Sequence, residues 1–291
     1  MSYAFIAAHA GEFPVRRMCE VLKVSRSGYY DWLGRKPSQR QHANEALLVA
    51  IRRVYEASRQ SYGSPRIHAA LKQQGIQVGH KRIARLMRAA GLVGQSPRRR
   101  RPVTTQREPG AVAAPNLLAQ NFTASRPDDI WLADLTYIDT REGWLYLALV
   151  MDLFSRRLVG WSMADHMRAE LVEQALRMAF GRRFPTAALL HHSDRGSQYT
   201  STLIRDLLAS HHVQVSMSGV GNCYDNAPME SVIGTLKTEC ATTTFTTRAE
   251  ARRVIFEYIE VWYNRQRLHS SLGYLSPAAF EQHFYETHSV R

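Results

Sequence analysis

Apolar residues recur every three to four positions through the first third of the chain, which is the period of an amphipathic helix. Residues 15–22 and 26–33 form a first pair of such segments, joined by a short turn. A longer segment spans 44–57, and a second pair follows at 64–75 and 80–91, each member ending at a glycine. The pattern predicts an all-helical front region that contains two helix-turn-helix-like pairs.

Residues 98–124 lack this period and are rich in Pro, Ala, Thr and Gln, which predicts a linker. Beyond them come three strand-like runs, at 130–139, 144–153 and 157–163, with turn residues between them. Helices and strands then alternate: helix 168–180, strand 188–192, helix 201–210, strand 213–217 and long helices after 226. This order predicts an α/β core of the ribonuclease-H-like class.

Four parts are expected from these patterns. They are an N-terminal helix-turn-helix at 1–40, a second helical DNA-binding domain at 41–97, the linker at 98–124, and the core with its C-terminal helices at 125–285.

The net charge of +13 is concentrated at the front of the chain. Residues 1–101 hold 20 Lys or Arg and 5 Asp or Glu, whereas the rest hold 18 and 20. A basic region of this kind attracts phosphate backbones through counterion release. A surface that is charged only for solubility would mix both signs. The front third is therefore predicted to bind nucleic acid, most simply double-stranded DNA.

The second helix of each pair carries the candidate DNA contacts, because that helix enters the major groove in helix-turn-helix units. A plain helical hairpin would show the same pattern. Four arginines at the start of the linker either follow the backbone of a bound duplex or keep the linker extended. The candidates are Arg26, Tyr29, Tyr30, Lys81, Arg82, Arg85, Arg88, Arg98, Arg99, Arg100 and Arg101.

Membrane and zinc proteins are not supported. No segment approaches the roughly 20 apolar residues of a membrane span, and Ala4–Ala8 is too short for a signal-peptide core, so we expect a cytoplasmic, nucleoid-associated bacterial protein. The cysteines, Cys19, Cys223 and Cys240, are far apart and form no C-x-x-C pair. Any metal site must then be built from carboxylates, which favour Mg²⁺ or Mn²⁺.

Three acids stand where such a site would form. Asp134 lies within an otherwise apolar strand, and Asp194 ends the strand-like segment 189–194. Glu230 opens a helix, and 35 residues lie between Asp194 and Glu230. Two acids on adjacent strands with a third on a helix can hold two divalent ions for phosphoryl transfer. Each acid alone has an ordinary explanation as a turn, ion-pair or solvated residue. Together with the basic front region they predict a metal site.

The segments around these acids resemble those of the DDE transposases in the retroviral-integrase superfamily, and more closely the OrfB-type catalytic subunit of bacterial insertion-sequence family three. The matching segments are 131–137, 152–156, 192–199, 221–230 and 263–277. The resemblance implies a retroviral-integrase-type core in which Asp134, Asp194 and Glu230 bind metal and catalyse strand cleavage and transfer. It also implies an OrfA partner, joined by ribosomal frameshifting, and action as a dimer or larger assembly on DNA.

Further residues are weighed beside the triad. Lys237 lies two helical turns after Glu230 on the same face, where it either contacts a DNA phosphate or is simply solvated. Gln198 and Tyr199 are candidates for flanking the scissile end. Asn222, Asp225 and Asn226 are expected to cap the Glu230 helix. His192 and His269 are expected to be structural or phosphate-contacting, and Asp152 to have a folding role beside Arg156.

The main hypothesis is a Mg²⁺-dependent polynucleotidyl transferase acting on the ends of its own mobile element. One alternative is a DNA-binding regulator that keeps the ribonuclease-H-like fold without catalysis, but an inactive relative would be expected to lack at least one acid. Another is a nuclease of the same fold that hydrolyses DNA without joining it. The helix pairs and the C-terminal segment favour the transposase over this nuclease.

Overall fold

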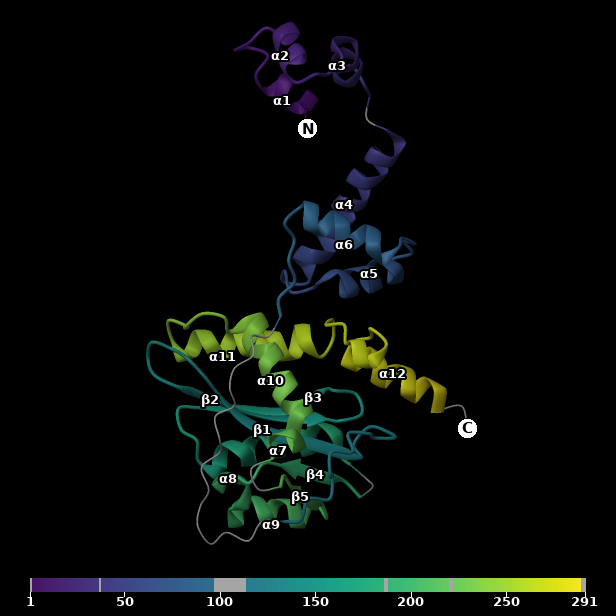
Figure 1. Ribbon diagram of the computed structural model, residues 1–291. Helices are drawn as coiled ribbons and strands as arrows, with labels where there is room; N and C mark the ends of the chain where they lie inside the picture. Colours follow the sequence, from purple (N-terminus) through teal and green to yellow (C-terminus); the bar gives the residue numbers. More distant parts are fainter. Residues whose placement is uncertain (1, 37, 97–113, 186–187, 220–221, 289–291) are drawn as a thin grey trace. The chain divides into compact units, whose positions relative to one another are not determined.

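The computed structural model describes residues 2–36, 38–96, 114–185, 188–219 and 222–288 (Figure 1). It separates into two compact units, Met1–Arg52 and Arg53–Arg291, and each is described by itself. Arg98, Arg99, Arg100 and Arg101, with most of the expected linker, lie outside the described residues. The expected four-part division of the chain stays a prediction.

The front unit begins with a three-helix bundle made of α1 (Ser2–Ala8), α2 (Val15–Val21) and α3 (Arg26–Leu33). Its core consists of Ile6, Met18, Cys19 and Tyr29. The Ser25 side chain accepts a hydrogen bond from the Gly28 amide at 3.2 Å and so caps the start of α3. Helix α1 is not among the helices that the sequence pattern predicts.

Helix α4 (Gln39–Ala57) crosses the boundary between the units. The second helix pair is α5 (Ser64–Gln73) and α6 (His80–Ala89), which pack together. Gly75 and Gly91 follow these helices with φ of +82° and +67°, the left-handed conformation that glycine adopts without strain. Gly63 occupies the N-cap position of α5, and Ser64 is the first residue of the helix.

One five-stranded sheet forms the centre of the second unit. Its strands are β1 (Ile130–Ile138), β2 (Leu145–Asp152), β3 (Leu158–Ala164), β4 (Leu190–Ser193) and β5 (Gln214–Met217). They lie in the order β3-β2-β1-β4-β5, with β1, β2 and β3 antiparallel and β4 and β5 parallel to β1. This is the ribonuclease-H-like arrangement that the order of elements predicts.

Helices cover both faces of the sheet (Figure 1). Against one face lie α7 (Ala169–Arg183), α8 (Ser197–Thr200) and α9 (Thr202–Ser210), which share a core with Trp131, Ala133 and Val150 of the strands. The remaining elements are η1 (Cys223–Asn226), α10 (Ala227–Cys240), α11 (Arg248–Glu257), η2 (Tyr258–Tyr263), η3 (Ser270–Leu272) and α12 (Pro277–His288). Over the described residues, no helix has both the length and the apolar character needed to cross a bilayer.

Buried polar side chains fix the C-terminal elements to the core. The Asn264 side chain accepts a hydrogen bond from the Leu158 amide and donates one to the Leu158 carbonyl, both at 2.9 Å, so it pairs with the edge of β3. Arg267 forms a bidentate pair with Glu239 of α10, and both side chains are nearly inaccessible to water. The segment 263–277 therefore has a structural role.

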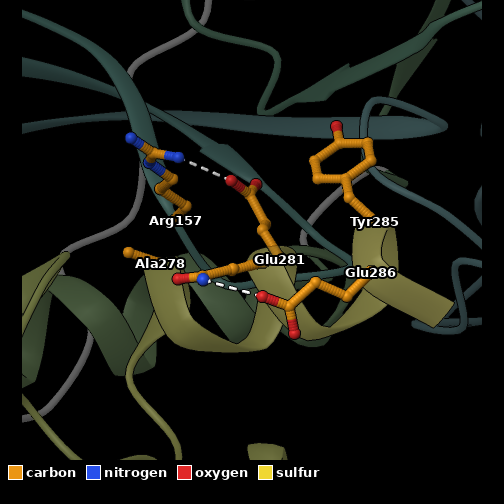
Figure 2. Close-up of a pocket in the computed structure, with 6 residues that line it drawn as sticks. Arg157, Ala278, Glu281, Tyr285 and Glu286 are labelled. Atoms are coloured by element: carbon orange, nitrogen blue, oxygen red, sulfur yellow. Dashed lines mark hydrogen bonds and ion pairs between the residues drawn. The ribbon is translucent and has the colours of Figure 1, made fainter. Parts of the chain in front are cut away.

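Helix α12 is held by Glu281, which points from the helix toward Arg157 (Figure 2). Glu281 is 2% exposed and pairs with Arg157 at 2.6 Å and Arg183 at 2.8 Å. The shallow pocket beside it is lined by Arg157, Ala278, Glu281, Gln282, Tyr285 and Glu286. None of the three candidate acids lines this pocket, so it belongs to the anchoring of α12.

Candidate catalytic site

The register of the two central parallel strands brings Asp134 and Asp194 together. Leu132 of β1 pairs with His192 of β4. Asp134 lies two residues after Leu132, and Asp194 lies two residues after His192. Neighbouring strands are about 4.8 Å apart. The two carboxylates are therefore side by side at the carboxyl end of the parallel pair, where sites in α/β sheets form.

Helix α10 reaches the same place because its start is tied to β1. Strand β1 continues past β4, which leaves the edge of β1 unpaired from residue 133 onward. There the Asn226 side chain donates a hydrogen bond to the Ala133 carbonyl at 3.1 Å. Glu230 lies about one helical turn after Asn226. The tether thus sets the third acid next to the two aspartates.

The charges of Asp194 and Glu230 act on Asp134. Burial, together with these two nearby charges, raises the pKa of Asp134 to about 8. A hydrogen bond from the Leu135 amide at 2.7 Å and the charge of Lys237 oppose the rise. Burial also raises the pKa of Glu230, although that residue is exposed at the surface. Repulsion of this kind is relieved by a bound cation.

The loop after Asp194 is shaped to hold that carboxylate. The Gly196 amide donates a hydrogen bond to Asp194 at 3.0 Å. A Cβ atom at Gly196 would lie 3.1 Å from Asp194 Oδ1 and 2.9 Å from Gln198 Oε1, so a side chain at this position would displace at least one of these two groups. Gln198 itself donates to the Met167 carbonyl at 2.9 Å and remains partly accessible.

Beneath the aspartates lies a buried layer formed by Tyr199 and His191. Tyr199 is 2% exposed, so the expectation that it contacts DNA is wrong. Among the described residues its hydroxyl has no hydrogen-bond partner, and neither do the ring nitrogens of His191. Burial raises the pKa of Tyr199, and the charges of Asp134 and Asp194 add to the rise. The hydroxyl therefore stays protonated near the acids.

The donor set suits a hard divalent cation, since carboxylate oxygens are the ligands that Mg²⁺ prefers. Among the residues that the structure describes, no three acidic, histidine or cysteine side chains yet converge closely enough to hold a metal ion. Of the three acids, Glu230 is the exposed one.

Lys237 lies between the acids and an exposed aromatic pair. Its charge acts on Asp134, and its ammonium lies 4.4 Å from the centre of the Tyr137 ring. Tyr137 in turn contacts Trp144 with ring centres 4.7 Å apart. Neither ring is among the residues that the sequence pattern picked out, because an aromatic residue in a strand ordinarily indicates packing.

The loop that precedes α10 does not cap the helix as expected. Asn222 accepts a hydrogen bond from the Tyr224 amide and so caps the short η1. Asp225 accepts hydrogen bonds from the Gly219 amide and from the side chains of Asn116 and Gln120. Asn226 is the N-cap residue of α10, but its side chain binds β1 and makes no cap hydrogen bond. These side chains position the loop and the helix.

Other expected structural roles are confirmed. His192 contacts the hydroxyl groups of Ser216 and Ser218, which ties β4 to β5. His269 is buried, and burial and nearby arginines lower its pKa to about 2. Asp152 accepts hydrogen bonds from Ser155 and from the Asp128 amide. Its role in folding is therefore to bind these two residues.

The candidate DNA contacts differ in accessibility. On α3, Arg26 and Tyr30 are exposed, but Tyr29 is 2% exposed and packs in the bundle core, so its ring is not available to DNA. On α6, Ile83 and Met87 are buried. The opposite side of α6 is basic, with Lys81, Arg85 and Arg88 exposed and Arg82 partly so.

Three family profiles match the chain. Those described as "Integrase core domain" match residues 124–223 and 211–277, and one described as "HTH-like domain" matches residues 42–101. The family profiles thus identify the core and the helical region in front of it, and they do so without reference to the sheet topology.

Relatives are similar over nearly the whole chain. The chain is 46% identical over 270 residues to the insertion element IS600 uncharacterized 31 kDa protein of Shigella sonnei, covering 92% of this chain and 99% of that one. It is 43% identical over 288 residues to the transposase InsF for insertion sequence IS3A of Escherichia coli strain K12, covering 97% and 98%. Among solved structures, the HTLV-2 integrase catalytic core domain in complex with magnesium has a TM-score of 0.43 and 15% identity, covering 55% of this chain and 99% of that one.

Proposed function

The chain belongs to the family of IS3-type insertion-sequence transposases with an integrase core, and from this premise we propose that it cuts and rejoins DNA at the ends of its own element with Asp134, Asp194 and Glu230. The observation that supports this most directly is the strand register that pairs the two aspartates, together with the Asn226 tether that adds the third acid.

The three carboxylates would hold Mg²⁺ or Mn²⁺, with two ions in each site. Such ions supply an activated attacking oxygen and stabilise the leaving oxygen of a phosphodiester. The chain's own contribution would be positional: β1 and β4 would hold two of the ligands, and the Asn226 tether would hold the helix that carries the third. Lys237 is placed to contact a phosphate of the same DNA strand, because its charge already reaches Asp134.

The basic face of α6 and the exposed Arg26 and Tyr30 of α3 would hold the terminal repeats and target DNA. Joining two element ends needs two sites held together, so we propose a homo-oligomer on DNA. An OrfA portion, separate or fused, would add end recognition. Without the OrfA portion, the carboxylate chemistry would stay intact, but the protein would select the correct element ends less well.

Strand transfer tests the proposal. A labelled element-end oligonucleotide is incubated with plasmid and Mg²⁺ or Mn²⁺, using the wild type and Glu230→Gln, which keeps size and removes charge. We expect joined products that vanish in the variant while DNA binding persists.

Cleavage without joining, if adding the OrfA fusion does not restore joining, would point to a nuclease. Binding with no metal-dependent chemistry in any form of the protein would contradict the enzyme and leave a DNA-binding regulator.

A further inference from the structure

An exposed aromatic corner lies beside the catalytic acids and is not used by the carboxylate chemistry. It consists of Tyr137 near the end of β1 and Trp144 just before β2, which are 44% and 47% exposed. Their ring centres are 4.7 Å apart and their planes make an angle of 70°. We call this pair the aromatic corner.

Positive charge borders the aromatic corner. The Lys237 ammonium lies 4.4 Å from the centre of the Tyr137 ring, and Arg248 donates a hydrogen bond to the Trp144 carbonyl at 3.2 Å. Adjoining exposed apolar side chains, unlike single ones, often mark a binding surface. An apolar ring face between two cations is complementary to a nucleobase attached to a phosphate backbone. It is a poorer match for a purely apolar protein surface, because binding one would remove water from both cations.

The aromatic corner is close to the site of chemistry. Lys237 lies seven residues after Glu230 along α10, which is about 10 Å along the helix axis. Successive bases of a strand are about 3.4 Å apart, so this span corresponds to about three nucleotides. A base that reaches the rings therefore belongs to the DNA next to the phosphate that the acids would attack.

A base within a duplex has both faces covered by its neighbours, so only an unstacked base can lie against a protein ring. We propose that the aromatic corner stacks an unpaired base of the element end, within about three nucleotides of the scissile phosphate, while Lys237 contacts the adjoining phosphate. This inference rests on the proposed function and names a positioning site for its substrate. The ring angle lets one ring accept the face of the base while the other closes its edge.

Fluorescence separates this stacking from catalysis. Element-end oligonucleotides carry 2-aminopurine, one position at a time, over the three nucleotides on each side of the cleavage point. They are bound to the Glu230→Gln protein, which keeps the strand intact. In the Trp144→Ala background, we expect the fluorescence of 2-aminopurine at one position to rise because that base leaves the duplex. When Trp144 is present, stacking on its ring should quench the fluorescence at the same position.

Strand transfer provides the second readout. Trp144→Ala and Tyr137→Ala are expected to lower the yield roughly 10- to 100-fold, and Trp144→Phe and Tyr137→Phe to retain most of it, because an aromatic face remains. An oligonucleotide that is abasic at the responsive position should abolish the difference between wild type and Trp144→Ala. Tyr285→Ala removes an aromatic ring that is 48% exposed on α12 and serves as the matched control.

The outcomes are distinct. If no position responds to Trp144 and both alanine variants join DNA like the wild type, the aromatic corner does not bind a base, although the proposed function stands. If Trp144→Ala changes the oligomeric state in sizing experiments and not the fluorescence, the corner contacts a second copy of the chain and the inference is overturned. If the wild type makes no joined product with metal even when the OrfA fusion is added, the proposed function fails, and the fluorescence still decides whether the corner stacks a base.

Discussion

The side-chain amide of Asn226 donates a hydrogen bond to the carbonyl oxygen of Ala133 at 3.1 Å, and both atoms are buried. This bond joins the start of α10 to the strand residue that precedes Asp134. It fills the edge that β1 exposes once β4 has ended. The position of Glu230 relative to the two aspartates thus depends in part on one amide group that is not itself one of the three candidate acids.

Asn226→Ala should therefore impair catalysis more than folding. We expect strand transfer to fall roughly 100-fold, because displacements of about 1 Å in a catalytic group have effects of this size. Leaving the Ala133 carbonyl unpaired should lower the free energy of unfolding by about 1–3 kcal/mol.

Asn264→Ala is the matched control, since it removes buried amide contacts to the β3 edge instead. It should lower the melting temperature and spare activity per folded molecule. Equal loss of activity in both variants would show that the Asn226 bond acts only through stability.

Gly196→Ala tests the loop that holds Asp194. The added methyl group would meet the carboxylate at 3.1 Å and the Gln198 amide oxygen at 2.9 Å, so one of them must move. We expect at least a tenfold loss of strand transfer and a change in unfolding free energy within about 1 kcal/mol. Gly181→Ala, where a Cβ meets nothing within 4 Å, is the control and should stay active.

Asp134→Asn should stabilise the metal-free protein at high pH. The folded-state pKa of Asp134, about 8, lies above its ordinary value of 3.8 because burial and the other acids disfavour the charged form. As pH rises from about 4 to 8, the unfolded chain loses this proton first, so folding becomes less favourable. The asparagine variant avoids this loss and should gain about 1–2 kcal/mol above pH 8.

Urea unfolding in EDTA across this pH range measures the difference between Asp134→Asn and the wild type. The difference should grow with pH and vanish near pH 4. A constant difference would mean that the charge of Asp134 is not destabilising in the folded protein. Adding Mg²⁺ should stabilise the wild type alone.

The sequence predicted the order of the strands, and the three acids that it picked out lie near one another, but it predicted their surroundings less well. Asp134 could be found because a charge in an apolar strand is conspicuous, and the segments around Asp194 and Glu230 resemble a known family. The role of Asn226 could not be found, because it depends on β4 ending before β1 does, which is a tertiary property. Local pattern suggested a helix cap instead.

Burial of aromatic residues was the other limit. Tyr29 and Tyr199 were expected at the DNA surface and are buried, whereas Tyr137 and Trp144 are exposed. A tyrosine is amphipathic, so its position in the sequence does not decide whether the ring packs inside or faces water. In α3 the unexpected helix α1 covers Tyr29.

Glu281→Gln tests the anchoring of α12 (Figure 2). Burial alone would raise the pKa of Glu281, but hydrogen bonds and charges from Arg183 and Arg157 outweigh it and hold the pKa below its usual range. Removing the charge leaves Arg183 poorly paired in a buried position, so we expect a loss of about 3 kcal/mol at neutral pH.

The sign of the pH dependence follows from the lowered pKa of Glu281. The stabilisation is present above its ordinary value of 4.5 and is lost as pH falls through the lower folded-state pKa. Thermal unfolding of wild type and Glu281→Gln should therefore converge in acid. Curves that stay separated by the same amount would show that packing, not charge, distinguishes the two proteins.

The basic face of α6 offers the most direct test of how the front of the chain holds DNA. Lys81, Arg85 and Arg88 are exposed there, and Ile83 and Met87 on the opposite side are buried, so replacing the three cations should leave the fold intact. Each phosphate contact contributes about 0.9 to the slope of log affinity against log salt concentration. If all three contact the backbone, the triple alanine variant should reduce that slope by between two and three. Fluorescence anisotropy with an element-end duplex at several salt concentrations measures it, and Arg177→Ala on α7, an exposed arginine of the core, is the control. An unchanged slope would place the DNA on another surface and remove α6 from the binding site.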